Sequence, residues 1–296
     1  MRGRRLKVLL RNRAAVVGAA LVAMMALAAL GADLLATHDP ETRQQVFRAP
    51  PSSEHWLGTD ENGFDVWSRL VHGARASLLT ALSAVGFALL VGVPLGLAAG
   101  WYGGIVDGVL MRVVDVLLAF PSVLLAVAIA ALAGKPSLTT VVFAVGVVLA
   151  PPFVRQVRAA VLQVRAQEYV TAARALGATD ARLLWRTVLP NCIAPILVLA
   201  TLSTGIAILD AAGLSFLGLG PPETSPEWGV MLTKAFRYLL HAEQWILLPP
   251  GLAISLTVLG FNLLGDGLRD AYDPRSSYSP PAAGAAPPPA SSTKGA

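Results

Sequence analysis

Long apolar stretches dominate the pattern of hydrophobic and polar positions along the chain. A helix that crosses a bilayer needs about 20 largely apolar residues, because a rise of about 1.5 Å per residue must cover about 30 Å of hydrocarbon. Six stretches approach or exceed this length: 14–36, 76–100, 113–133, 138–154, 192–212 and 245–265. The pattern therefore predicts an all-α, polytopic membrane protein with six transmembrane helices.

The first stretch, 14–36, has two interpretations, because basic residues precede it and alanine-rich sequence follows. A cleaved signal peptide has an apolar run of about 7–15 residues. The run here is longer, which favours a retained anchor helix.

The composition agrees with this pattern. The chain has 296 residues, of which 55% are hydrophobic and 14% charged, and its mean hydropathy is +0.62. Soluble proteins carry about 25% charged residues, so a large soluble domain, a nucleic-acid-binding protein and a disordered regulator are poor fits. The lone cysteine, Cys192, excludes an internal disulfide.

The positions of lysine and arginine predict the orientation, since cytoplasmic flanks of membrane spans carry an excess of both. With the six spans above, sixteen of these residues lie on the side of the N-terminus and of loop 155–190, and seven lie on the other side. Both termini are therefore expected in the cytosol. The net charge of +5 then reflects topology and does not indicate an anionic substrate.

The inside loop 155–190 reads as helical, because its apolar residues recur at roughly helical spacing. Gly177 suits the position that follows a helix C-terminus, and Thr179 or Asp180 can cap a second short helix. Pro190 is expected to end that second helix. The loop is thus predicted to fold as helix, turn and helix.

This hairpin is compatible with three roles. A basic helix-turn-helix is typical of DNA binding, but one tethered at both ends to membrane spans could hardly enter a groove. A solvated connection is the plain alternative. A docking element is favoured, because Ala172, Ala173 and Gly177 leave room for a partner's backbone, and flanking arginines can meet an acidic surface.

The stretch at 168–191, EYVTAARALGATDARLLWRTVLPN, resembles the EAA loop of permease subunits in bacterial ABC importers. That pattern runs E-A-A, three residues, G, nine residues, I-x-L-P. Thr171 replaces the usual glutamate and Thr187 the usual isoleucine. Five residues match at the right spacing: Ala172, Ala173, Gly177, Leu189 and Pro190.

Further motifs narrow the resemblance to the C-type subunit of the dipeptide/oligopeptide (peptide/nickel) permease group. HWLGTDENGFDVWSRLVHGARASL at 55–78 is similar to a signature of that group, with Phe64 where an arginine is usual. LSFLGLG at 214–220, PEWG at 226–229 and GFNLLGDGLRD at 260–270 follow in the expected order. The resemblance covers roughly residues 5–275.

The resemblance implies the type I ABC importer permease fold in the bacterial inner membrane. It implies import of di- or oligopeptides, with nickel complexes or other small solutes as the alternative cargo. The implied partners are a homologous second permease subunit, two cytosolic ABC ATPases, an extracytoplasmic solute-binding protein and membrane lipid, but no nucleic acid. It divides the chain into an anchor and extracytoplasmic segment at 1–73, a permease core at 74–270 and a disordered cytosolic tail at 271–296.

In this family the EAA loop couples the permease to its ATPase. The resemblance therefore assigns coupling to loop 155–190 and to these residues: Glu168, Thr171, Ala172, Ala173, Gly177, Asp180, Leu189 and Pro190. The sequence contains no G-x-x-x-x-G-K-[ST] motif, so this chain is not expected to bind ATP or to be an enzyme. ATP and Mg²⁺ are expected in the partner ATPases, and no cofactor is expected here.

Aspartates inside spans need an explanation, because one at a helix centre costs about 2.5–3.5 kcal/mol on insertion scales. Asp33 and Asp210 lie near the outer ends of their spans, where they can reach water. Asp115 lies three residues after Arg112, which favours a local ion pair. The alternative is that Asp115 and Asp210 line the translocation path.

Other functions fit less well. A membrane hydrolase needs a nucleophile with a positioned base or a metal cluster, and the four scattered histidines indicate neither a catalytic nor a metal site. A stand-alone secondary transporter favours internal repeats, and none is evident. Proline and glycine within the spans fit hinges and static kinks equally well; they are Pro94, Gly96, Pro121, Pro195 and Gly205.

Overall fold

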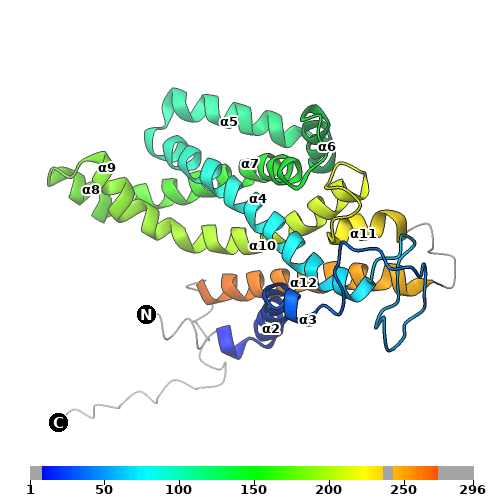
Figure 1. Cartoon of the computed structure of the whole chain (residues 1–296). Helices are drawn as coiled ribbons and strands as arrows, with labels where there is room; N and C mark the ends of the chain where they lie inside the picture. The colour runs from blue at the N-terminus through cyan, green and yellow to red at the C-terminus, as the bar shows by residue number, and fades with distance from the viewer. Residues whose placement is uncertain (1–8, 236–242, 273–296) are drawn as a thin grey trace, which may run out of the picture.

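A computed structural model describes residues 9–235 and 243–272. Helices make up the whole regular structure in these ranges, and one isolated antiparallel bridge joins Thr59 to Asp65. Figure 1 shows the helices packed as an elongated bundle. The all-α prediction is confirmed, whereas the predicted tail lies outside the described residues from position 273 onward.

Five helices are each long and apolar enough to cross a membrane, and a bent pair forms a sixth span if it is counted as one. The first predicted span divides at Gly31 into α2 and the short helix α3 (Ala32–Leu35). The five are α2 (Arg13–Leu30), α4 (Val66–Tyr102), α7 (Leu138–Arg165), α10 (Leu189–Phe216, continuous from Asp180) and α12 (Gln244–Tyr272).

The predicted span at 113–133 falls on two helices, which count as one span only as a bent pair. α5 (Gly104–Ala119) and α6 (Ser122–Leu132) meet at an angle of 96°. Phe120 and Pro121 both have extended backbones between them, with ψ of 140° and 128°. Proline lacks an N–H donor and drives the residue before it out of the helical region, which explains the break.

α7 extends eleven residues beyond its predicted end at Val154 and runs through Pro151 and Pro152 without interruption. Two adjacent prolines commonly make a helix irregular, but they do not do so here. An interior proline costs about 3 kcal/mol in an isolated helix. Here one face of α7 is buried against its neighbours, including Phe153 and Val157, and that packing holds the helix together.

The most extensive helix pair joins α4 to α7. Gly92, Gly96 and Gly100 of α4 lie four residues apart and form a seam along it. A Cβ at any of the three would lie 2.6–2.7 Å from a side-chain Cβ of α7. Small residues at this spacing let two membrane helices approach closely, so that dispersion forces stabilise the pair.

The two ends of the bundle differ in structure. Figure 1 shows the α8–α9 hairpin at one end, and the irregular segment between α3 and α4 together with α11 (Trp228–Ala235) at the other. α4, α7 and α10 run between these ends. The hairpin is thus separated from the irregular segment by the length of the spans.

Candidate functional site

The predicted coupling loop folds as the expected helix, turn and helix. α8 (Glu168–Ala175) starts after Gln167, and Glu168 in its first turn suits the positive end of the helix dipole. Val170 is the only buried residue of α8, and it packs with Trp101 and Leu183 in the inner hydrophobic cluster. Ala173 is partly buried against the same cluster, and the other residues of α8 are exposed, so a narrow apolar face holds the helix.

Gly177 shapes the turn that follows α8. Its φ of +87° lies in the left-handed region that glycine adopts without strain. The N–H of Gly177 donates to the carbonyl of Arg174 at 3.0 Å, and the N–H of Ala178 donates to that of Ala173 at 3.1 Å. These two bonds form a Schellman motif, which fixes the direction in which the chain leaves α8.

Two polar contacts make the turn rigid. Thr179 caps α9 (Asp180–Leu183) by accepting the N–H of Arg182 at 3.4 Å. Arg174 donates to Asp180 across the turn at 3.0 Å, and its guanidinium lies 4.9 Å from the ring centroid of Trp101. Because Trp101 belongs to α4, these contacts tie the hairpin to the C-terminal end of that span.

The expected helix end at Pro190 is wrong. α9 continues through a π-helical turn, Leu184–Val188, directly into α10, and Pro190 lies in the first turn of α10. A π turn shifts each hydrogen bond to the fifth residue, which accommodates the N–H that proline lacks. Asn191 adds a side-chain bond to the carbonyl of Thr187 at 2.7 Å. The hairpin therefore joins α10 without a flexible joint.

The hairpin presents an open, partly apolar surface. Leu176 is 89% exposed at its tip, and a Cβ added to Gly177 would meet nothing within 4 Å. A surface hollow of about 310 Å³ lies beside them. Of the residues assigned to coupling, six lie on α8, its turn and α9, while Leu189 and Pro190 lie one helix further on.

Asp115 pairs with a different arginine from the one expected. Its carboxylate accepts from Arg155 of α7 at 2.5 Å, so the local pair with Arg112 is wrong. Asp107 of α5 likewise pairs with Arg158 of α7 through two bonds. Two ion pairs therefore tie α5 to α7, and only the helix arrangement brings these residues together.

Asp210 and Asp33 have different surroundings. Asp210 is half-buried on α10. Asp33 is exposed and accepts from Arg75 at 2.9 Å and from His72 at 3.2 Å. The contact of Asp33 with water and the path-lining role of Asp115 and Asp210 stay predictions.

At the opposite end, the structure joins two of the sequence motifs. Trp228 of the PEWG motif donates through its indole to the carbonyl of Leu70 at 2.9 Å, and through its backbone to Ser77 at 3.3 Å. Glu227 is buried and caps α11 by accepting the N–H groups of Gly229 and Val230 at 3.0 Å. Burial raises the pKa of Glu227, and these bonds counteract part of the shift.

Arg69 adds further contacts between the same two motifs. It is buried, donates to the carbonyls of Glu223 at 2.9 Å and Ser225 at 2.8 Å, and lies 4.4 Å from the ring centroid of Phe64. It also lines a hollow of about 460 Å³. Phe64 thus supplies an aromatic face to Arg69 where the family pattern has an arginine. The sequence contains both motifs, at 55–78 and 226–229, but no local pattern in it indicates that they are in contact.

Comparison with known proteins identifies the family. Residues 92–278 match the family model described as "Binding-protein-dependent transport system inner membrane component". Residues 3–51 match the "N-terminal TM domain of oligopeptide transport permease C". These two ranges cover the anchor helix and most of the spans.

Relatives that match over most of their length are named as permease proteins of the same kind. The chain is 46% identical to the dipeptide transport system permease protein DppC of Alkalihalophilus pseudofirmus, over 91% of this chain and 88% of the relative. It is 47% identical to the di/tripeptide permease protein DppC of Pseudomonas aeruginosa, over 89% of each. It is 42% identical to the glutathione permease protein GsiD of Pectobacterium atrosepticum, over 90% and 88%.

A solved structure shares the fold. A chain of the MetNI methionine ABC transporter in an inward-facing conformation superposes with a TM-score of 0.55, at 20% identity, over 69% of this chain and 97% of that one. The type I ABC importer permease fold is thereby confirmed. The chain accordingly belongs to the family of binding-protein-dependent transport system inner membrane components, and is a multi-pass membrane permease of the oligopeptide C type.

Proposed function

We propose that this chain is a pore-forming subunit of an ATP-driven importer of di- or oligopeptides, and that the α8–α9 hairpin couples it to partner ATPases. The observation that carries this proposal is the hairpin itself: an exposed, rigid element at one end of the spans in a member of this family. The relatives named for dipeptides, di/tripeptides and glutathione support peptide cargo.

The continuity of the helices supports a mechanical role. α7 runs unbroken to Arg165 just before the hairpin, and α9 runs unbroken into α10 just after it. A displacement of the hairpin therefore reaches two spans through rigid helices. ATP-driven closure of the ATPases would move α7 and α10 together and change which side of the membrane the path opens to.

In this proposal the chain itself does not bind ATP. We infer that two partner ATPases bind ATP and Mg²⁺, that a homologous permease subunit completes the path, and that a solute-binding protein delivers cargo from outside. The charge asymmetry supports a cytosolic hairpin and cytosolic termini. Asp115 and Asp210 are the residues of this chain assigned to the path.

Cysteine cross-linking tests both the docking and the orientation. Cys192 is buried, so an exposed engineered cysteine is the main reactive thiol. With a short thiol cross-linker in membranes, Ala172→Cys is expected to capture an ATPase subunit. The matched variant Ser53→Cys, exposed between α3 and α4, is expected to capture none and to react with a membrane-impermeant maleimide from outside.

The opposite pattern would contradict the proposal. Capture of an ATPase through Ser53→Cys, or labelling of Ala172→Cys from outside intact cells, would reverse the orientation. Failure of Ala172→Cys to capture an ATPase in membranes that contain the assembled complex would remove the docking role of the hairpin.

A further inference from the structure

Two histidines that are 17 positions apart in the sequence lie side by side in the segment between α3 and α4. The rings of His38 and His55 have centroids 4.7 Å apart. Ligand atoms of His38, His55 and Glu54 all lie within 4.8 Å of one another. Two imidazoles and one carboxylate form the kind of ligand set that holds Zn²⁺ with an open fourth position.

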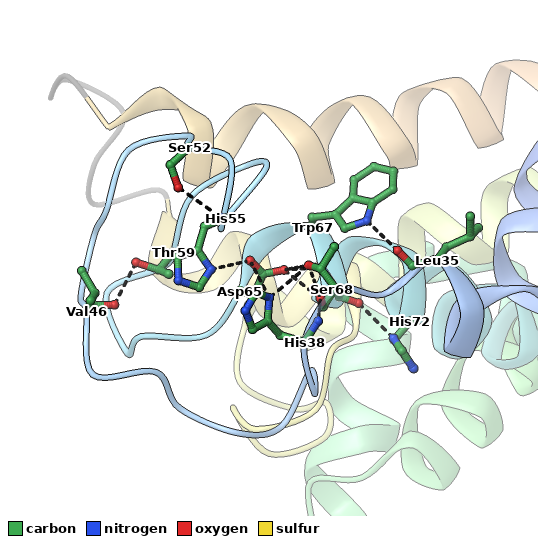
Figure 2. Close-up of polar contacts among 11 residues, drawn as sticks. Leu35, His38, Val46, Ser52, His55, Thr59, Asp65, Trp67, Ser68 and His72 are labelled. Atoms are coloured by element: carbon green, nitrogen blue, oxygen red, sulfur yellow. Dashed lines mark hydrogen bonds and ion pairs between the residues drawn. The ribbon is translucent and has the colours of Figure 1, made fainter.

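A buried aspartate orients the ring of His55 and lies close to that of His38. Asp65 is fully buried, and its Oδ1 lies 2.9 Å from Nδ1 of His55 and 3.8 Å from Nδ1 of His38. Figure 2 shows the two histidines approaching Asp65 from two sides. A histidine that ligates a metal commonly donates its other ring N–H to a carboxylate, which fixes the tautomer. This arrangement leaves Nε2 of His55 for a metal.

The other oxygen of Asp65 is held by the protein. Its Oδ2 accepts from the N–H of Ser68 at 2.8 Å and from the hydroxyl of Ser68 at 2.7 Å, which caps α4. Asp65 is therefore fixed to the first turn of a long span. His55 therefore gains a rigid support, which is what a metal site requires of the groups behind its ligands. Nδ1 of His38 lies 3.0 Å from the hydroxyl oxygen of Thr37 instead.

The charges and the access also suit a divalent cation. Glu54 and Asp65 carry two negative charges beside two imidazoles that are neutral when they ligate a metal. Glu54 is exposed, and a surface hollow of about 590 Å³ reaches both it and His55. In a tetrahedral site with bonds of about 2.0–2.1 Å, ligand atoms lie about 3.3 Å apart, so the three groups, now within 4.8 Å of one another, need only small side-chain movements to enclose an ion.

We propose that His38, Glu54 and His55 bind a divalent transition-metal ion, with Zn²⁺ as the best fit, and that Asp65 positions His55. His38 follows α3, whereas Glu54 and His55 belong to the loop that leads into α4. A bound ion therefore fastens the end of the anchor helix to the start of α4. This site is independent of cargo and of ATPase docking.

Metal titration of the full-length chain tests this assignment. The chain is purified in detergent with a tag that contains no histidine, stripped with a chelator and titrated with Co²⁺. One equivalent is expected to bind with the visible absorption of a tetrahedral nitrogen–oxygen site, and Zn²⁺ is expected to displace it. Zn²⁺ is also expected to raise the unfolding temperature.

Variants separate the site from adventitious binding. Replacing a ligand, as in His38→Gln or Glu54→Gln, is expected to weaken binding by at least the roughly 10–100-fold that loss of an outer-shell partner costs. Both side chains are partly or fully exposed, so these variants are expected to fold, and the unfolding temperature of the metal-free forms checks this. His72→Gln is the matched control, since His72 lies nearby but faces Asp33.

Two results would overturn the proposal. One is the absence of stoichiometric Co²⁺ or Zn²⁺ uptake by the wild-type chain. The other is equal uptake by wild type and by a His38→Gln/Glu54→Gln double variant of unchanged metal-free stability. Either result would leave the cluster as a hydrogen-bonded cap of α4 alone.

Discussion

The close packing of α4 on α7 predicts that Gly96→Ala destabilises the protein. A Cβ on this residue would lie 2.6 Å from Cβ of Val157 and 2.8 Å from the carbonyl oxygen of Val154. Neither atom can rotate away, because one belongs to the backbone and the other is attached directly to it. Ordinary contact begins at 3.4 Å, so Gly96→Ala must separate the two helices locally by about 0.8 Å, from 2.6 to 3.4 Å.

Overpacking of this kind costs about 1–3 kcal/mol. Gly86→Ala is the matched control, because Gly86 lies on the same helix and a Cβ there meets nothing within 4 Å. Both variants gain the helix propensity of alanine, so it cancels in the comparison. Reversible unfolding by SDS in mixed micelles, followed by circular dichroism, is expected to give Gly96→Ala a free energy of unfolding about 1–3 kcal/mol below that of Gly86→Ala. Equal values for the two variants would refute the close packing of α4 on α7.

Three further substitutions test single contacts. Trp228→Phe removes the indole bond to the carbonyl of Leu70, and the same unfolding assay is expected to show a loss of about 0.5–1.5 kcal/mol; no loss would mean that the bond does not form. Thr179→Ala removes the cap of α9, so amide exchange at Arg182 is expected to accelerate by the equivalent of about 0.5–2 kcal/mol, and unchanged exchange would count against the cap. Asp107→Asn breaks the pair with Arg158, whose partial exposure limits the expected loss to about 1 kcal/mol; a much larger loss would indicate a fully desolvated pair.

Local signals in the sequence predicted several parts of the structure correctly. Hydropathy located the spans because crossing a bilayer requires a minimum apolar length. Gly177 and Thr179 are at the turn and cap expected of them, because glycine tolerates a positive φ and a hydroxyl side chain satisfies free N–H groups at a helix start. These features depend on a few neighbouring residues, so a single sequence contains enough information for them.

Features set by tertiary packing were not predictable in this way. Pro190 is predicted to end a helix, but a π turn keeps that helix continuous, and packing does the same for α7 at Pro151. Asp115 was matched with the nearest arginine in sequence, whereas the α5–α7 contact supplies Arg155 instead. The approach of His38 to His55 likewise depends on a fold of the segment between two helices. Contacts between residues far apart in the sequence depend on the three-dimensional fold, and local sequence patterns do not reveal them.

The most direct test of the coupling proposal compares two glycines that share a left-handed backbone and an open surface. Gly177 has φ of +87° and Gly134 has φ of +69°, and a Cβ at either meets nothing within 4 Å. Asparagine tolerates this conformation, so Gly177→Asn and Gly134→Asn add similar bulk with similar strain. Gly134 lies between α6 and α7, away from the hairpin.

The measurement is ATP-dependent peptide uptake by proteoliposomes that contain the assembled importer and its binding protein. Gly177→Asn is expected to lower uptake by at least about tenfold, the effect of 1.4 kcal/mol of lost docking energy, while Gly134→Asn keeps uptake near the wild-type level. Wild-type uptake by Gly177→Asn would contradict the proposal that the hairpin transmits ATP-driven motion to the spans.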